Sequence, residues 1–129
     1  LRTLDPDSPD YKPNYEGNQW SRDHAYHQGT VWPFLLHEYF QAYFKIYGTS
    51  TENKKKVMLE LEPLRKHFYQ DNGIHCISEI FNGSEPQEGK GCIQQAWSVA
   101  AIIKLYIDFG LDKIEQEEEP MPKYTFLKV

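Results

Sequence analysis

Glu79 is the carboxylate in this chain whose surroundings best suit acid–base chemistry. It stands alone between two segments, residues 22–33 and 91–97, that combine aromatic rings with hydrogen-bonding side chains. A pyranose needs both kinds of group, because its CH faces stack on rings while its hydroxyls require paired donors and acceptors. The three segments together predict a sugar site that contains one carboxylate.

The neighbours of Glu79 indicate how it could act. Ile77, Ile80 and Phe81 would hold the side chain rigidly and partly desolvate it, which disfavours the charged form and raises its basicity. Such a carboxylate could take a proton from an attacking water. The alternative is a glutamate on the exposed face of a short strand, and spacing alone favours that alternative.

Most candidate sugar ligands lie in the first segment. The polar side chains that could line a pocket are His27, Gln28 and Thr30, and Trp32 could form a stacking wall. Alternatively, Trp32 packs in the core and His27 caps a helix. Arg22 and Asp23 could contact substrate, or pair with each other and brace the loop.

The third segment adds Gln95 and Trp97 at the start of a predicted helix. Residues two apart on a helix do not share a face, so the two side chains cannot both face the sugar. We expect Gln95 to reach the sugar and Trp97 to be a core residue.

Composition excludes several classes of protein. A length of 129 residues predicts a single region, 1–129, with one core that buries roughly two thirds of the unfolded surface. The net charge of −5, with no basic cluster beyond Lys54, Lys55 and Lys56, argues against nucleic acid as a partner. No stretch approaches the roughly 18 to 20 apolar residues of a membrane span, so we expect no membrane partner and a cytoplasmic location.

Neither metal nor cofactor is expected. His24 and His27 are three residues apart, but the pattern lacks the close ligand pairs that structural zinc sites use. Cys76 and Cys92 fall short of the density found in disulfide-dependent folds, which favours free thiols.

Three to four main helices with long loops are predicted, which makes the chain all-α. Residues 1–21 are a proline-rich loop, followed by a helix over 31–47 with Thr30 as its cap, Pro33 in its first turn and Gly48 at its end. A second helix begins at the capping pattern TSTE of residues 49–52, bends or breaks near Pro63 and closes at Gly73. The third covers 92–109 and ends at Gly110. The tail, 111–129, is expected to be partly disordered, although the apolar residues 124, 126 and 127 could dock.

The first and third helices are apolar on almost every side, which is typical of helices buried in a larger assembly. Buried and peripheral helices alternate, which favours helical hairpins packed around an inner ring. Three helices cannot close such a ring. The rest of the wall must then come from upstream sequence or from another molecule, and self-association of the chain is plausible.

Several ordered motifs resemble the C-terminal catalytic region of glycogen debranching enzymes, the amylo-alpha-1,6-glucosidase part. They are YHQGTVWP at residues 26–33, SEIFNG at 78–83, GCI at 91–93 and QAWSVA at 95–100, with weaker similarity at 1–4 and 15–17. The likeness extends from about residue 1 to 109.

The resemblance implies an α/α toroid of six helical hairpins and an inverting glucosidase. Its substrate would be an α-glucan or branched oligosaccharide carrying a single α-1,6-linked glucose. Glu79 matches the general base, whereas the general acid of such enzymes comes from an earlier hairpin. Asp23 resembles a structural or substrate-binding position more than the acid, so we expect this chain alone to be inactive. The alternative functions are a non-catalytic carbohydrate-binding or regulatory helical module, and a purely structural, self-associating bundle.

Overall fold

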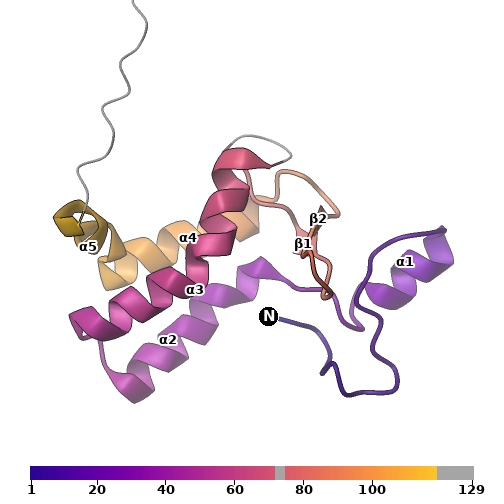
Figure 1. The fold of residues 1–129 in the computed structure, drawn as a ribbon, viewed down its shortest axis with the longest axis horizontal. Coiled ribbons are helices and arrows are strands. Elements are labelled where there is room, and N and C mark those ends of the chain that lie inside the picture. The colour runs from indigo at the N-terminus through magenta and orange to yellow at the C-terminus, as the bar shows by residue number, and fades with distance from the viewer. Residues whose placement is uncertain (72–74, 119–129) are drawn as a thin grey trace, which may run out of the picture.

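Helices dominate the computed structural model, which describes residues 1–71 and 75–118, without the side chains of 115–118. The helices are α1 (Gln19–Ala25), the 3-10 turn η1 (Pro33–Leu35), α2 (Leu36–Tyr47), α3 (Thr51–Gln70), α4 (Ala96–Phe109) and α5 (Leu111–Glu118). Two short strands, β1 (Ile80–Phe81) and β2 (Gly89–Lys90), form an antiparallel pair (Figure 1). The predicted all-α class is confirmed.

The first long helix begins later than predicted, and Thr30 is not its cap. Val31 forms an isolated β-bridge with Phe81, with N–H···O distances of 2.8 and 2.9 Å in the two directions. This pairing keeps the backbone extended through Trp32, so helical geometry starts only at Pro33, which opens η1 as a first-turn proline. Gly48 ends α2 at φ +81°, as predicted.

The second helix, α3, starts where its capping pattern predicts. Ser50 accepts a hydrogen bond from the Asn53 backbone N–H at 3.2 Å, and the Asn53 amide binds the carbonyls of Tyr47 and Gly48. The helix is unbroken at Pro63, and Figure 1 shows that it changes direction along its length. The predicted end at Gly73 lies outside the described residues.

The last long helix, α4, also starts later than predicted and ends at Gly110 as predicted, with φ +61°. Residues 92 and 95 pair with the segment before β1 instead, because the Glu79 N–H donates to the Cys92 carbonyl and the Gln95 N–H donates to the Ile77 carbonyl. Helix α5 was not predicted. Leu111 and Ile114 are buried, so this helix is held by its apolar side. Residues 119–129 of the predicted tail lie outside the described residues.

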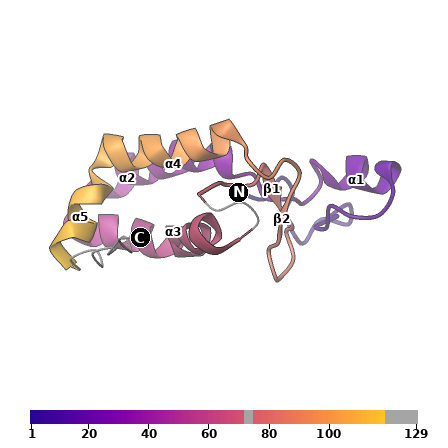
Figure 2. The same cartoon turned by 90° about the horizontal axis from the view of Figure 1, so that it is seen from above.

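The core lies between the long helices. Figure 2 shows α2 and α4 in one layer and α3 in the other, with α5 at one end, where it contacts both α3 and α4. Their buried contacts are made by Phe40, Phe44, Val57, Leu61, Leu105 and Leu111. His37 of α2 is buried against α4, with Nε2 2.9 Å from the Asp108 carboxylate.

Large apolar side chains remain on the outside of the helices. Many belong to α2 and α4, among them Tyr39, Ile46, Tyr47, Ile103 and Ile107. This agrees with the apolar circumference read from the sequence. Within the described residues, no helix combines the length and the apolarity that crossing a bilayer would require.

Loops and strands form the other end of the molecule (Figures 1 and 2). Arg2 bridges to Val31, Val31 bridges to Phe81, and β1 pairs with β2, so four segments lie side by side. The N-terminal lead-in contains helix α1, which was not predicted. Its Asn18 cap accepts from Ser21, a signal that is present in the sequence but is weak for so short a helix.

Candidate active site

Glu79 lies where the three motif segments meet. Its Oε1 accepts a hydrogen bond from the hydroxyl of Tyr26 in the first segment. Its Oε2 accepts from the backbone N–H of Cys92 in the third segment at 3.0 Å, and its own N–H donates to the Cys92 carbonyl at 2.8 Å. The same carboxylate is thus bound by Tyr26, which lies 53 positions away along the chain, and by Cys92, which lies 13 positions away.

The backbone on either side of Glu79 is anchored. Ile77 and Ile80 are 2% and 0% exposed, while Glu79 itself is half-buried. The Ser78 N–H and hydroxyl both lie within 3.3 Å of Nε2 of the buried His67. This short extended segment therefore presents Glu79 between side chains that are fixed in the core.

Gly91 is required for the approach of Cys92 to Glu79. Its φ of +70° is rarely adopted by residues with a side chain, and a Cβ at this position would lie 2.5 Å from Oε2 of Glu79. A glycine here lets the bend at residues 91 and 92 close directly over the carboxylate.

Tyr26 belongs to a row of aromatic rings. Its ring centroid lies 4.7 Å from that of Trp32 and 5.6 Å from that of Tyr15, and the row continues through Phe34 to Trp97. Desolvation, followed by the hydrogen bond to the Glu79 carboxylate, raises the pKa of Tyr26. The phenol therefore stays protonated and acts as a donor to Glu79.

Two of the predicted sugar ligands are interior. Thr30 is fully buried and donates its hydroxyl to the Tyr26 carbonyl at 2.7 Å. Trp32 is 5% exposed, and its Nε1–H lies 3.0 Å from the same carbonyl and 3.2 Å from Oγ1 of Thr30. For Trp32, this is the packing arrangement named above as the alternative to a stacking wall.

His27 and Gln28 are exposed next to the Tyr26 contact. The His27 ring stacks on Trp32 with a centroid distance of 5.1 Å and an interplanar angle of 12°. Gln28 is held by its backbone, which donates to Ala25 and accepts from Lys12 at 2.7 Å. Both side chains are placed at the same end of the molecule as Glu79.

Arg22 and Asp23 lie on α1. Arg22 donates to the Gly17 carbonyl at 2.7 Å and lies over the ring of Tyr15, so it fastens the start of α1 and does not brace Asp23. Asp23 is exposed.

Gln95 and Trp97 lie at the start of α4. Gln95 is half-buried at the start of α4, and its backbone bond to Ile77 brings it to the segment that carries Glu79. The prediction that Trp97 is a core residue is wrong, because it is 49% exposed, although its ring stacks on Phe34 at 5.1 Å and lies 6.4 Å from that of Trp32. Helical spacing identifies which residues share a face but not whether another part of the fold covers that face.

Sequence reasoning also missed Tyr26, which was quoted as part of a motif but given no role. Its signal was only its place beside His27 and Gln28. A contact between residues 26 and 79 depends on the β-bridge between Val31 and Phe81, which spacing along the chain does not reveal.

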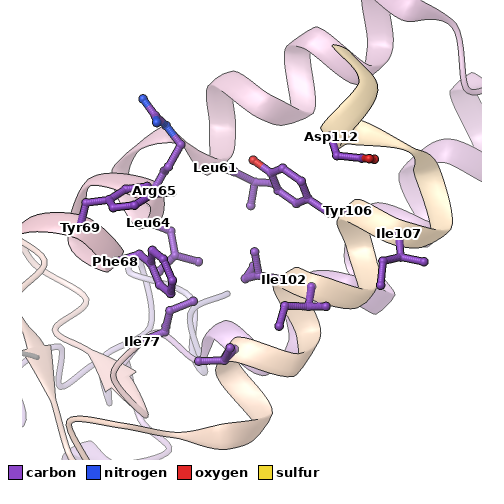
Figure 3. Close-up of a pocket in the computed structure, with 12 residues that line it drawn as sticks. Leu61, Leu64, Arg65, Phe68, Tyr69, Ile77, Ile102, Tyr106, Ile107 and Asp112 are labelled. Atoms are coloured by element: carbon purple, nitrogen blue, oxygen red, sulfur yellow. The ribbon is translucent and has the colours of Figure 1, made fainter. Parts of the chain in front are cut away.

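An apolar groove of about 390 Å³ lies elsewhere, between α3 and α4 (Figure 3). Its lining includes Leu64, Phe68, Ile102 and Tyr106, and it does not include Glu79. Such a wall offers few partners for sugar hydroxyls. Within residues 1–71 and 75–118, no three His, Cys, Asp or Glu side chains are grouped so that they could hold a metal ion.

Comparison with known proteins places the chain in a class. Residues 1–104 match the family model described as amylo-alpha-1,6-glucosidase, so the chain belongs to that family. It is accordingly a glycoside-hydrolase-type domain of the kind found in the C-terminal part of glycogen debranching enzymes. No curated protein and no solved structure matches the chain.

Proposed function

We propose that Glu79 is the general base in an inverting hydrolysis of α-1,6-linked glucose. The observation that carries the proposal is the convergence of the Tyr26 hydroxyl and the Cys92 N–H on its two carboxylate oxygens. A group held from two sides has a defined direction, which a base needs in order to orient an attacking water. Membership of the family supports the reaction class and the α-glucan substrate.

The two hydrogen bonds to Glu79 are compatible with a third, from that water. A carboxylate offers about four lone-pair positions, and the two hydrogen bonds occupy one on each oxygen. A further position on either oxygen can accept a proton from water. In an inverting enzyme this water attacks the face opposite the leaving group, and an acid roughly 6.5 to 9.5 Å from the base protonates the leaving oxygen.

The side chains around Glu79 suit the sugar pocket. The exposed His27 and Gln28 and the half-buried Gln95 offer hydrogen-bonding groups, and Trp97 offers a half-exposed indole on which a pyranose face could stack. Gln95 caps α4 and lies before its first residue, so the rule that separates helix faces does not keep Gln95 and Trp97 apart. Thr30 and Trp32 support the pocket from beneath because they are buried. In this proposal the residues that contact the sugar directly are His27, Gln28, Gln95 and Trp97, whereas Thr30 and Trp32 do not contact it.

The general acid and the remaining pocket walls are proposed to come from another part of the same domain. The exposed apolar residues of α2 and α4, such as Ile46 and Ile107, support a further layer of helices against this chain, as in an α/α toroid. The isolated chain is then expected to release no glucose from a branched dextrin. Turnover by the purified chain would contradict this part of the proposal.

The proposal is tested by Glu79→Gln in the intact enzyme that carries this chain. Removal of a general base typically costs 10² to 10⁴ in rate, so we expect kcat to fall by roughly that factor while the side-chain shape is kept. Glu88→Gln is the matched control, since Glu88 is exposed on the same hairpin and pairs with Lys90.

Product stereochemistry gives an independent readout. Inversion at an α-linkage releases β-glucose first, which NMR detects before mutarotation. A Glu79→Gln enzyme with the wild-type rate, or α-glucose as the first product, would refute the proposed role. Glucan binding by the chain without hydrolysis in the intact protein would favour a non-catalytic carbohydrate-binding module.

A further inference from the structure

We infer that Tyr26, together with the bend at Gly91 and Cys92, positions Glu79 for catalysis and joins it to the sugar-binding segment. This inference rests on the proposed function of Glu79 as the base. Tyr26 contacts the carboxylate and is not expected to contact the substrate, so it is a positioning residue.

The two donors to Glu79 come from different parts of the chain and bind different oxygens. Tyr26 reaches Oε1 from the end of α1, and Cys92 reaches Oε2 from the end of the hairpin. Two anchors on two oxygens prevent the carboxylate from rotating about its terminal bond, whereas one anchor would not. The orientation of the remaining lone pairs is therefore set by the protein before substrate binds.

Tyr26 is itself held by its backbone and by its ring. Its backbone N–H donates to the Arg22 carbonyl, and its own carbonyl accepts from the Thr30 hydroxyl and the Trp32 indole. Its ring meets the Trp32 ring edge-on at 4.7 Å. Thr30 and Trp32, which the sequence placed in the sugar pocket, thus act through Tyr26 by holding its backbone, and the phenol cannot swing away from Glu79 without losing its ring contact with Trp32.

The same contacts link the base to the sugar ligands. His27 and Gln28 follow Tyr26 directly, and the His27 ring stacks on Trp32. Any displacement of this segment moves the donor of Oε1. Glu79 and the predicted hydroxyl ligands therefore keep one relative geometry, which is the requirement for placing water and glucose together.

The test is Tyr26→Phe in the intact enzyme, with Tyr39→Phe as the control because Tyr39 is exposed on α2, in the helical part of the molecule. The variant keeps the ring and removes only the donor. Loss of a hydrogen bond to a charged group is expected to lower kcat by roughly 10- to 100-fold, with little change in KM.

The split between kcat and KM separates positioning from mere packing. A packing role would lower the amount of folded enzyme but leave kcat per folded molecule unchanged, whereas a positioning role lowers kcat per folded molecule. A Tyr26→Phe enzyme with the wild-type kcat per folded molecule would overturn the inference.

Gly91→Ala tests the other anchor if Tyr26→Phe does not fold. The added Cβ would displace Oε2, and kcat is expected to fall while binding of a glucose-containing inhibitor persists. Wild-type activity of Gly91→Ala would likewise overturn the inference. Full activity of Glu79→Gln would refute the proposed function itself, whereas an inactive Glu79→Gln beside normal Tyr26 and Gly91 variants would refute only the positioning.

Discussion

The helical layers and the loop-and-strand end of this molecule are stabilised by different interactions. The helices meet through buried side chains such as Phe44, Leu61 and Leu105. The loop-and-strand end is joined by backbone hydrogen bonds between distant segments, including Thr3 to Thr30, Val31 to Phe81 and Gly83 to Pro13. Burial of apolar side chains does not require a particular orientation between them, whereas a hydrogen bond requires a defined angle and distance.

This difference explains where the candidate site lies. Glu79 extends from a segment whose neighbours are paired through their backbones on both sides, so its position follows from hydrogen-bond geometry. The helical layers supply the stability on which that geometry depends. Changes in the helical layers should therefore alter stability, and changes in the loop-and-strand end should alter local order and catalysis.

The largest expected effect on stability comes from Leu105→Ala. Leu105 is fully buried between the helices, and such truncations cost about 2 to 5 kcal/mol. Urea unfolding of the chain measures the loss, and Ile107→Ala on the same helix is the control because its side chain is 73% exposed. Equal losses for the two variants would mean that the core does not lie where the structure places it.

A smaller effect is expected for Gly83→Ala. A Cβ at Gly83 would lie 2.2 Å from the Gly29 carbonyl oxygen and 2.6 Å from the Tyr11 hydroxyl, so the loop segments must separate. Overpacking of this kind costs about 1 to 3 kcal/mol. Amide hydrogen exchange should speed up at Val31 and Phe81 while the amide of Leu105 stays protected. Equal acceleration at all three would show that the two ends unfold as one unit.

The smallest expected effect is on the stability of the fold at low pH. Hydrogen bonds from Lys104 and then His37 lower the pKa of Asp108, so this carboxylate adds stability above its unfolded value near pH 4, and the contribution is lost as the pH falls further. Asp108→Asn should be slightly less stable at neutral pH and lose less stability on acidification. Urea midpoints between pH 3 and 7 measure this, with the exposed Asp112→Asn as control. Parallel curves for Asp108→Asn and wild type would exclude this source of acid sensitivity.

Local signals predicted the ends of helices better than their starts. Gly48 and Gly110 end α2 and α4 as expected, because glycine adopts positive φ with little strain. The starts near Thr30 and Cys92 were wrong for one shared reason. Both residues lie next to backbone that pairs with the segment around Glu79, and a partner distant in sequence prevails over local helical preference.

The arrangement of the candidate site was less fully predictable than the fold class. Its three segments and its carboxylate were identified from residue types, and the structure brings these segments together at Glu79. The roles of individual side chains were less accessible. Trp32 and Trp97 are both tryptophans in aromatic motifs, yet one is buried and the other half-exposed, a difference that the tertiary packing around each ring decides.

The sequence by itself determined the helical class, the family resemblance and the candidate base, because these depend on residue types and on short-range spacing. Only the tertiary structure decided that Tyr26 and Cys92 bind the same carboxylate, that His37 is buried against Asp108, and that Thr30 supports Tyr26. Those contacts join residues far apart along the chain. Their formation depends on the β-bridges and helix packing of the whole fold, which no local pattern records.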